Sequence, residues 1–200
     1  MSLPIVVVVG ATGVQGGSVV NSLLETKQYR VRGLTRNLTS KASAALQARG
    51  VEMVAADLND LESLKKTFTG ADFVFGVTNF WVCSDLSLSM ASSDRSGKHI
   101  DPIFSKNQDP SIVAGDKTLE EKQGKNIGLA AKAANIKFLI FSSLADVSKE
   151  SDGKLKHVLH FDGKNRVEQF IRSLGVPCAF VYVGFYFTNL LYLYVSGSFY

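Results

Sequence analysis

The sequence is poor in the residues that tie a small fold together by covalent or metal links. Among 200 residues there are two cysteines, Cys83 and Cys178, and three histidines. The cysteines lie far apart with no CxxC or Cys/His spacing, so the sequence predicts neither a disulfide scaffold nor a metal site. With only four prolines and 46% hydrophobic residues, the composition is that of one globular domain. We expect a reduced, cytoplasmic protein, with the nucleus as a second location.

An excess of charge and long apolar runs are also lacking. The 22 basic and 18 acidic residues are scattered along the chain and leave a net charge of +4. A nucleic-acid binder gathers its basic residues on one face, so we expect no direct contact with nucleic acid. The apolar run near the amino end stops at Gly10, without the pattern of a secretory signal. Residues 178–195 approach the length of a membrane span, but Gly184, Thr188 and Asn189 interrupt them, and we expect no span.

Short β-branched runs alternate with helical patterns along the chain. Residues 61–68 predict a helix that begins after Asp60, a good N-cap, and ends before Gly70. The alternation predicts an α/β Rossmann fold, a doubly wound parallel sheet in the order 3-2-1-4-5-6 with helices on both faces. Near-continuous apolar runs, typical of buried parallel strands, lie at residues 5–9, 31–34, 51–55, 73–77, 138–141 and 178–183.

Two stretches do not follow this alternation. Residues 84–117 are rich in Ser, Asp and Lys, and a loop of this length is either a solvated loop or a mobile lid. The last residues, 192–200, lose any pattern. We therefore predict a domain over residues 1–191, with a mobile insertion at 84–117 and an irregular tail.

The strongest motif is VVVVGATGVQGG, in which a strand runs through spaced glycines into a helix. A pyrophosphate can lie on a helix N-terminus only where no Cβ blocks the backbone N–H groups. A tight turn that needs glycine for its own geometry is the alternative. The motif predicts a dinucleotide site, whose first part is made by Gly10, Thr12, Gly13, Val14, Gln15 and Gly16.

The end of the second strand indicates which cofactor is bound. An acidic residue there would hold the ribose 2′-hydroxyl of NAD, but the sequence has Arg36, with Lys41 a turn later. A guanidinium binds a 2′-phosphate with paired hydrogen bonds, so the sequence predicts NADP(H). A solvated surface cation is the alternative for Arg36.

Further site residues are expected where later strands end. Asp57 and Leu58 follow the third strand and are placed to meet the adenine. Thr78, Asn79 and Phe80 follow the fourth, at the edge of the sheet where the ligand crevice lies.

Together, GATGVQGG, LTRN, AADLND, VTNFW and above all HFDGKNRVEQF resemble the NmrA-like group of atypical short-chain dehydrogenase/reductases, specifically its HSCARG-type NADP(H) sensors. The resemblance implies a Rossmann fold that binds NADP(H) and reports the redox state to a protein partner, with a role in transcriptional regulation. It also implies a chain of about 300 residues, so the last third, which supplies much of the substrate or partner cleft, is missing here. An exposed apolar carboxyl end would then favour a homodimer.

The catalytic tyrosine of the wider superfamily is absent. Its reductases use a Ser after the fifth strand and a Tyr-x-x-x-Lys pair, whereas this chain has Ser142, Ser143 and His160-x-x-x-Lys164. A histidine beside Lys164 is mostly neutral at pH 7, so we expect His160 to be a positioned polar group. We assign Lys164 to cofactor binding, with proton transfer or a solvated position as alternatives. The two serines are either site residues or partners of backbone groups.

After the sixth strand, Tyr182 and Gly184 stand where the family places Arg and Pro, while Tyr186, Phe187 and Asn189 continue its pattern and are expected near the nicotinamide. Three hypotheses remain. The first is a regulator that binds NADP(H) without dehydrogenase turnover. The second is an NADPH-dependent reductase of a small carbonyl, quinone or phenylpropanoid-like compound that uses Lys164. The third is a defective fragment that binds the cofactor poorly.

Overall fold

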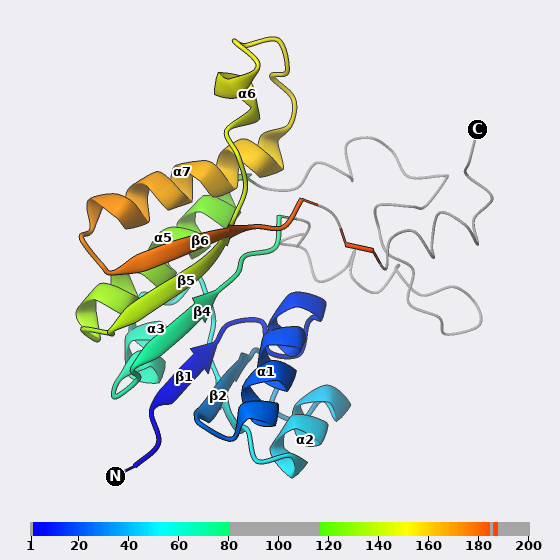
Figure 1. The fold of residues 1–200 in the computed structure, drawn as a ribbon, viewed down its shortest axis with the longest axis vertical. Coiled ribbons are helices and arrows are strands. Elements are labelled where there is room, and N and C mark those ends of the chain that lie inside the picture. The colour runs from blue at the N-terminus through cyan, green and yellow to red at the C-terminus, as the bar shows by residue number, and fades with distance from the viewer. Residues whose placement is uncertain (1, 81–116, 185, 188–200) are drawn as a thin grey trace, which may run out of the picture.

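A single parallel sheet organises the chain in the computed structural model, which describes residues 2–80, 117–184, 186 and 187 (Figure 1). Its strand order is β3-β2-β1-β4-β5-β6, as predicted, and each predicted strand agrees within two residues at either end. The strands are β1 (Ile5–Val8), β2 (Arg30–Thr35), β3 (Glu52–Ala55), β4 (Phe73–Gly76), β5 (Phe138–Ser143) and β6 (Cys178–Tyr182). The predictions for residues 84–116, Asn189 and residues 192–200 lie outside the described residues.

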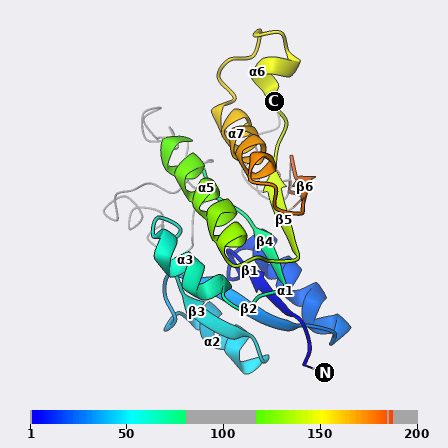
Figure 2. The same ribbon diagram turned by 90° about the vertical axis from the view of Figure 1, so that its left-hand side faces the viewer.

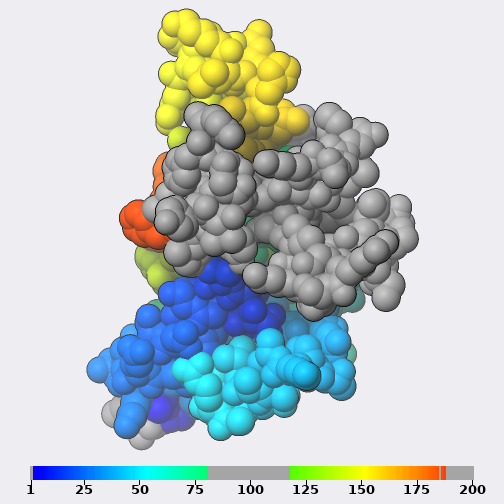
Figure 3. All heavy atoms as spheres, turned by 90° about the vertical axis from the view of Figure 1, so that its right-hand side faces the viewer, coloured from blue at the N-terminus to red at the C-terminus, as the bar shows by residue number. Residues whose placement is uncertain are grey.

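Helices lie on both faces of the sheet (Figures 1 and 2). On one face are α1 and α2, beside β1, β2 and β3, and on the other α3, α5 and α7 pack side by side. The sequence did not predict α6, one turn of helix that projects away from the sheet with its neighbouring loop (Figure 3, yellow). The helices are α1 (Val14–Thr26), α2 (Lys41–Ala48), α3 (Leu61–Phe68), α5 (Lys117–Ala133), α6 (Val147–Glu150) and α7 (Leu159–Ser173).

Local signals fix the ends of α3 where the sequence placed them. The Asp60 carboxylate accepts hydrogen bonds from the backbone N–H groups of Glu62 and Ser63, at 3.0 and 3.1 Å. Gly70, just past the other end, has a φ of +74°, which residues with a Cβ rarely adopt. These two residues set the length of α3 and so the position of the fourth strand.

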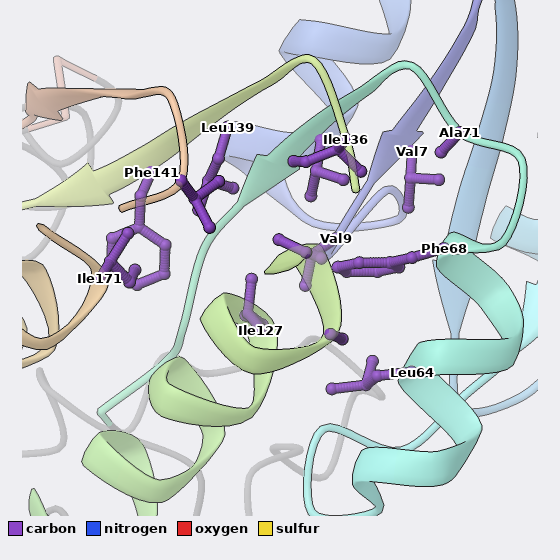
Figure 4. Packing of buried hydrophobic residues seen from close by; sticks show 14 of the residues in the cluster. Val7, Val9, Leu64, Phe68, Ala71, Ile127, Ile136, Leu139, Phe141 and Ile171 are labelled. Atoms are coloured by element: carbon purple, nitrogen blue, oxygen red, sulfur yellow. The ribbon is translucent and has the colours of Figure 1, made fainter. Parts of the chain in front are cut away.

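The main core lies between the sheet and the layer of α3, α5 and α7. Phe68 of α3, Ile127 of α5 and Ile171 of α7 are fully buried in one cluster with Leu139 and Phe141 of β5 (Figure 4). A smaller cluster lies under α1 and α2 on the opposite face. The two clusters pack the helices of both layers onto the sheet.

The prediction that β6 is a buried strand is wrong. It lies at the edge of the sheet, and Val181 and Tyr182 are 44% and 51% exposed. On the α1 side an apolar groove of about 760 Å³ runs over the sheet. Phe138 and Ile140 of β5 are among its lining residues, and none of the described residues that line it is charged. Apolar residues of β5 and β6 therefore lie on a side of the sheet that the described residues cover only in part.

No helix within the described ranges is long and apolar enough to cross a membrane. The same residues contain no group of three or more side chains placed to ligate a metal ion.

Candidate functional site

The glycine motif forms the loop that joins β1 to α1. Gly10 has a φ of +66°, and Gly13 is the N-cap of α1. A Cβ on Gly16 would lie 2.2 Å from the carbonyl oxygen of Gly10, which is far inside contact distance. Gly16 is therefore required for α1 to pack against the loop, which supports the tight turn as an explanation of the motif, while the phosphate cradle stays a prediction.

The first turn of α1 is open to an anion. None of the described side chains caps this helix and its first turn has no acidic residue, whereas Ser40, Asp60 and Asp146 cap α2, α3 and α6. Helix α7 also lacks a side-chain cap, but its first turn carries Asp162. The first N–H groups of a helix have no partner within it, and they attract negative charge. The start of α1 thus suits a phosphate group, with Thr12 and Val14 exposed beside it.

The predicted 2′-phosphate residues are exposed. Arg36 directly follows β2, and its side chain makes no hydrogen bond or ion pair within the described residues. Val8 of β1 lies opposite Gly33 of β2, so Arg36 leaves the sheet at the same edge as the glycine loop. Lys41 is the exposed first residue of α2. The guanidinium is therefore available to a ligand at that edge.

Asp57 and Leu58, which follow β3, make contacts within the protein itself. The Asp57 carboxylate accepts hydrogen bonds from the backbone N–H and the side-chain amide of Asn59, at 2.9 and 3.0 Å. Leu58 packs against the main core, and its carbonyl accepts a hydrogen bond from Asn126. Only Asp57 remains exposed at the position expected to meet an adenine.

Three elements meet around Lys164 in α7. Its ammonium donates to the carbonyl and hydroxyl oxygens of Thr78, at 2.9 and 3.0 Å, and to Oε1 of Glu120 in α5, at 2.5 Å. The Thr78 hydroxyl in turn donates to the same carboxylate oxygen, at 2.8 Å. An ammonium has three N–H bonds, and all three are used here. The solvated alternative for Lys164 is wrong, since 12% of its side chain is exposed.

His160 lies one turn before Lys164 and contacts aromatic rings. Its ring centroid is 5.6 Å from that of Phe80 and 4.8 Å from that of Phe161. Burial lowers the pKa of His160, and the Lys164 charge lowers it further, while the charges of Glu120 and Asp162 oppose the shift. The imidazole is thus mostly neutral at pH 7, as expected. Asn79, beside Phe80, is exposed.

A second cluster spans the carboxyl edge from α1 to β6. The Gln15 amide donates to the Ser142 hydroxyl, at 2.9 Å, and its oxygen lies 3.0 Å from the same hydroxyl and 3.1 Å from the Tyr186 hydroxyl. Ser143 instead donates weakly to the backbone carbonyls of Lys164 and Leu144, at 3.4 and 3.5 Å. This agrees with the second hypothesis for the serines, that they are partners of backbone groups. Phe187 is 85% exposed and Tyr182 binds Glu168, so neither side chain joins this cluster.

The HFDGK motif also contains a structural residue. The Asp162 carboxylate accepts hydrogen bonds from the backbone N–H and the hydroxyl of Ser148, at 3.1 and 2.5 Å, and so ties α6 to α7. Burial alone would raise the pKa of Asp162, but these hydrogen bonds hold it below its usual value. Two residues of one motif thus have different partners, since Lys164 binds Thr78 and Glu120 instead.

Sequence reasoning missed Glu120. This carboxylate is fully buried, and its Oε2 has no hydrogen-bond partner among the described residues. The available signal was its spacing, because Glu120 lies seven residues before the buried Ile127, on the same face of α5. A charged residue on the apolar face of a predicted helix marks a position that needs a partner.

The model of the NmrA-like family matches residues 4–197. Among curated proteins, the NmrA-like family domain-containing oxidoreductase lnaB of Aspergillus flavus is 32% identical over 180 residues, covering 90% of this chain and 46% of that protein. FrzB of Cladobotryum sp., with the same description, is 34% identical over 171 residues, covering 86% and 43%. The chain therefore spans about half the length of these relatives.

Solved structures have the same fold. The crystal structure of NmrA, a negative transcriptional regulator, superimposes with a TM-score of 0.68 at 26% identity, covering 94% of this chain and 48% of that one. That regulator has also been crystallised with NAD and, at 25% identity to this chain and a TM-score of 0.66, with NADP. The likeness covers the sheet and the helices on both its faces.

Proposed function

The chain belongs to the NmrA-like family, and from this we propose that it is an NADP(H)-binding regulator of the sensor type that undergoes no dehydrogenase turnover. Cofactor occupancy would change the surface presented to a protein partner, or to a second copy of the chain. A ligand shifts such an equilibrium only through its different affinity for the two states. The proposal therefore depends on which residues meet the cofactor.

The dinucleotide would lie across the carboxyl edge of the sheet. Between β1 and β4 the strand order reverses, which is where Rossmann folds bind dinucleotides. The open first turn of α1 would hold the pyrophosphate, and Arg36 and Lys41 would hold the 2′-phosphate. The nicotinamide half would then extend toward β4 and β5, where Thr78, Lys164 and Ser142 lie. When bound, NADPH supplies a hydride or a redox-dependent charge on its ring.

The state of Lys164 carries the proposal that this site does not turn over. A reductase needs an acid that gives a proton to the developing alkoxide. All three N–H bonds of Lys164 are held by Thr78 and Glu120, and burial keeps His160 neutral. The chain's own residues at this place hold protons and do not offer them to a substrate.

Titrations of NADPH and NADH test cofactor choice. We expect NADPH to bind more tightly than NADH. Arg36→Ala should weaken NADPH binding by about 1.5 to 3 kcal/mol, which is the contribution of hydrogen bonds between charged groups, and should have little effect on NADH. Arg49→Ala is a matched control, because Arg49 is another exposed arginine, bonded to Asn21. Equal affinities for the two cofactors would contradict the preference for NADP(H).

A reductase remains the second candidate, because relatives such as lnaB and FrzB are described as oxidoreductases. NADPH consumption with a panel of quinones and small carbonyl compounds tests it, in the wild type and in Lys164→Ala. We expect no turnover. NADPH consumption at several turnovers per second that is lost in Lys164→Ala would contradict the regulator hypothesis and favour the reductase.

A further inference from the structure

The pair of Glu120 and Lys164 places two opposite charges in the interior, beside the residues that follow β4. Their side chains are 0% and 12% exposed, and the atoms that meet are 2.5 Å apart. Thr78, which follows β4, binds both. The pair is therefore fixed to the carboxyl edge of β4, a strand that borders the point where the sheet reverses its order.

Stability alone is a poor reason for this arrangement. Taking a carboxylate and an ammonium out of water costs free energy that their attraction does not always offset, and apolar residues are often as stable in their place. Oε2 of Glu120 adds to the cost, since it has no hydrogen-bond partner among the described residues. A buried charge that is retained at this cost at the edge of a ligand crevice indicates an electrostatic task.

The two redox forms of the cofactor differ in one charge at this end. The nicotinamide ring is cationic in NADP⁺ and neutral in NADPH, so a nearby fixed charge changes the affinity of the oxidised form more than that of the reduced form. An isolated Lys164 would disfavour NADP⁺, and an isolated Glu120 would favour it. At the imidazole of His160, the charges of Lys164 and Glu120 act in opposite directions.

We infer that Glu120 is a positioning residue that neutralises Lys164 and thereby sets the ratio of affinities for NADP⁺ and NADPH. This inference rests on the proposed function, since it needs the nicotinamide half beside β4 and β5. Glu120 acts through Lys164 and does not touch the ligand, because its side chain is fully buried. For a redox sensor, this ratio of affinities decides which form of the cofactor occupies the site at a given cellular ratio of NADP⁺ to NADPH.

Isothermal titration of NADP⁺ and NADPH against Glu120→Gln tests the inference. The ratio of the two dissociation constants, oxidised over reduced, should rise about fourfold to thirtyfold, the effect of a unit charge at roughly 8 to 10 Å with an effective dielectric constant of about 20 to 40. Glu121→Gln is the matched control. Glu121 is the next residue of α5 and pairs with Arg166 and Lys125, whose side chains are exposed. The ratio of dissociation constants in Glu121→Gln should therefore stay within about twofold of wild type.

Lys164→Gln tests the same pair from the other side and should lower the ratio by a similar factor. It also serves if Glu120→Gln, which leaves an unpaired ammonium, does not fold. The double variant lacks both charges and should return to the wild-type ratio. A wild-type ratio in either folded single variant would overturn the inference, because a merely structural pair would change both affinities equally.

Titration of 2′,5′-ADP, which lacks the nicotinamide half, separates this inference from the proposed function. We expect it to bind the wild type and Glu120→Gln equally. If it does not bind the wild type, the proposed NADP(H) site is wrong. If it binds and the ratio remains constant in the single variants, only the role of Glu120 is wrong.

Discussion

Replacing Gly16 by alanine tests the geometry of the glycine loop directly. The new Cβ would lie 2.2 and 2.6 Å from the carbonyl oxygen and carbon of Gly10 and 2.8 Å from the carbonyl oxygen of Val9. These are backbone atoms of the loop, so they cannot move aside as a flexible side chain would. Overpacking of this kind costs about 1 to 3 kcal/mol or more, against a gain of at most about 1 kcal/mol from the helix propensity of alanine. We expect a net loss of about 2 kcal/mol in the free energy of unfolding.

Gly17→Ala is the control on the same helix. Its Cβ would lie 3.4 Å from the carbonyl oxygen of Ala11, an ordinary contact, so the variant should gain about 0.5 to 1 kcal/mol. Urea denaturation of both variants, with the slope m unchanged, gives the difference in stability. Because the clash separates α1 from the loop, NADPH affinity should fall only in Gly16→Ala. Equal stability of the two variants would refute the close packing of Gly16.

Three further predictions concern stability. Asp60→Ala removes the cap of α3 and should cost about 1 kcal/mol in urea denaturation, whereas Asp60→Asn should cost less, and equal losses would contradict the capping role. Phe68→Ala should cost about 3 to 5 kcal/mol, because Phe68 is fully buried, while Phe187→Ala should change little, and similar losses would contradict the burial. The lowered pKa of His160 means that the unfolded chain binds a proton first as the pH falls through about 6.5, so stability is lost below that pH. His160→Gln should lose less stability than wild type between pH 7.5 and 5.5, and an unchanged loss would show that His160 is not the group responsible.

The sequence predicted what local interactions determine. The strand order, the cap at Asp60 and the glycines of the α1 loop all depend on residues close together in the chain or on rules of chain connection, and the structure confirms them. The exposure of β6 was not predictable from its apolar residues, since burial depends on what covers a strand.

Long-range pairings in the site were also beyond sequence reasoning. Gln15 and Ser142 are 127 residues apart, and Glu120 and Lys164 are 44 apart. Cofactor binding by Lys164 stays a prediction, since a spacing pattern says nothing about a partner on another helix. Its pairing with Glu120 adds a neighbour that any role of this lysine has to take into account.

The link between Asp162 and Ser148 shows that a recurring sequence signature can be in part architectural. In HFDGK, the aspartate works as a joint that holds the projecting turn of α6, while the lysine two positions later donates hydrogen bonds to Thr78 and Glu120. A scan that transfers whole signatures between proteins would count both as functional groups. Substituting the joint would disturb the loop first and ligand recognition only through it, so the two losses would have to be measured separately.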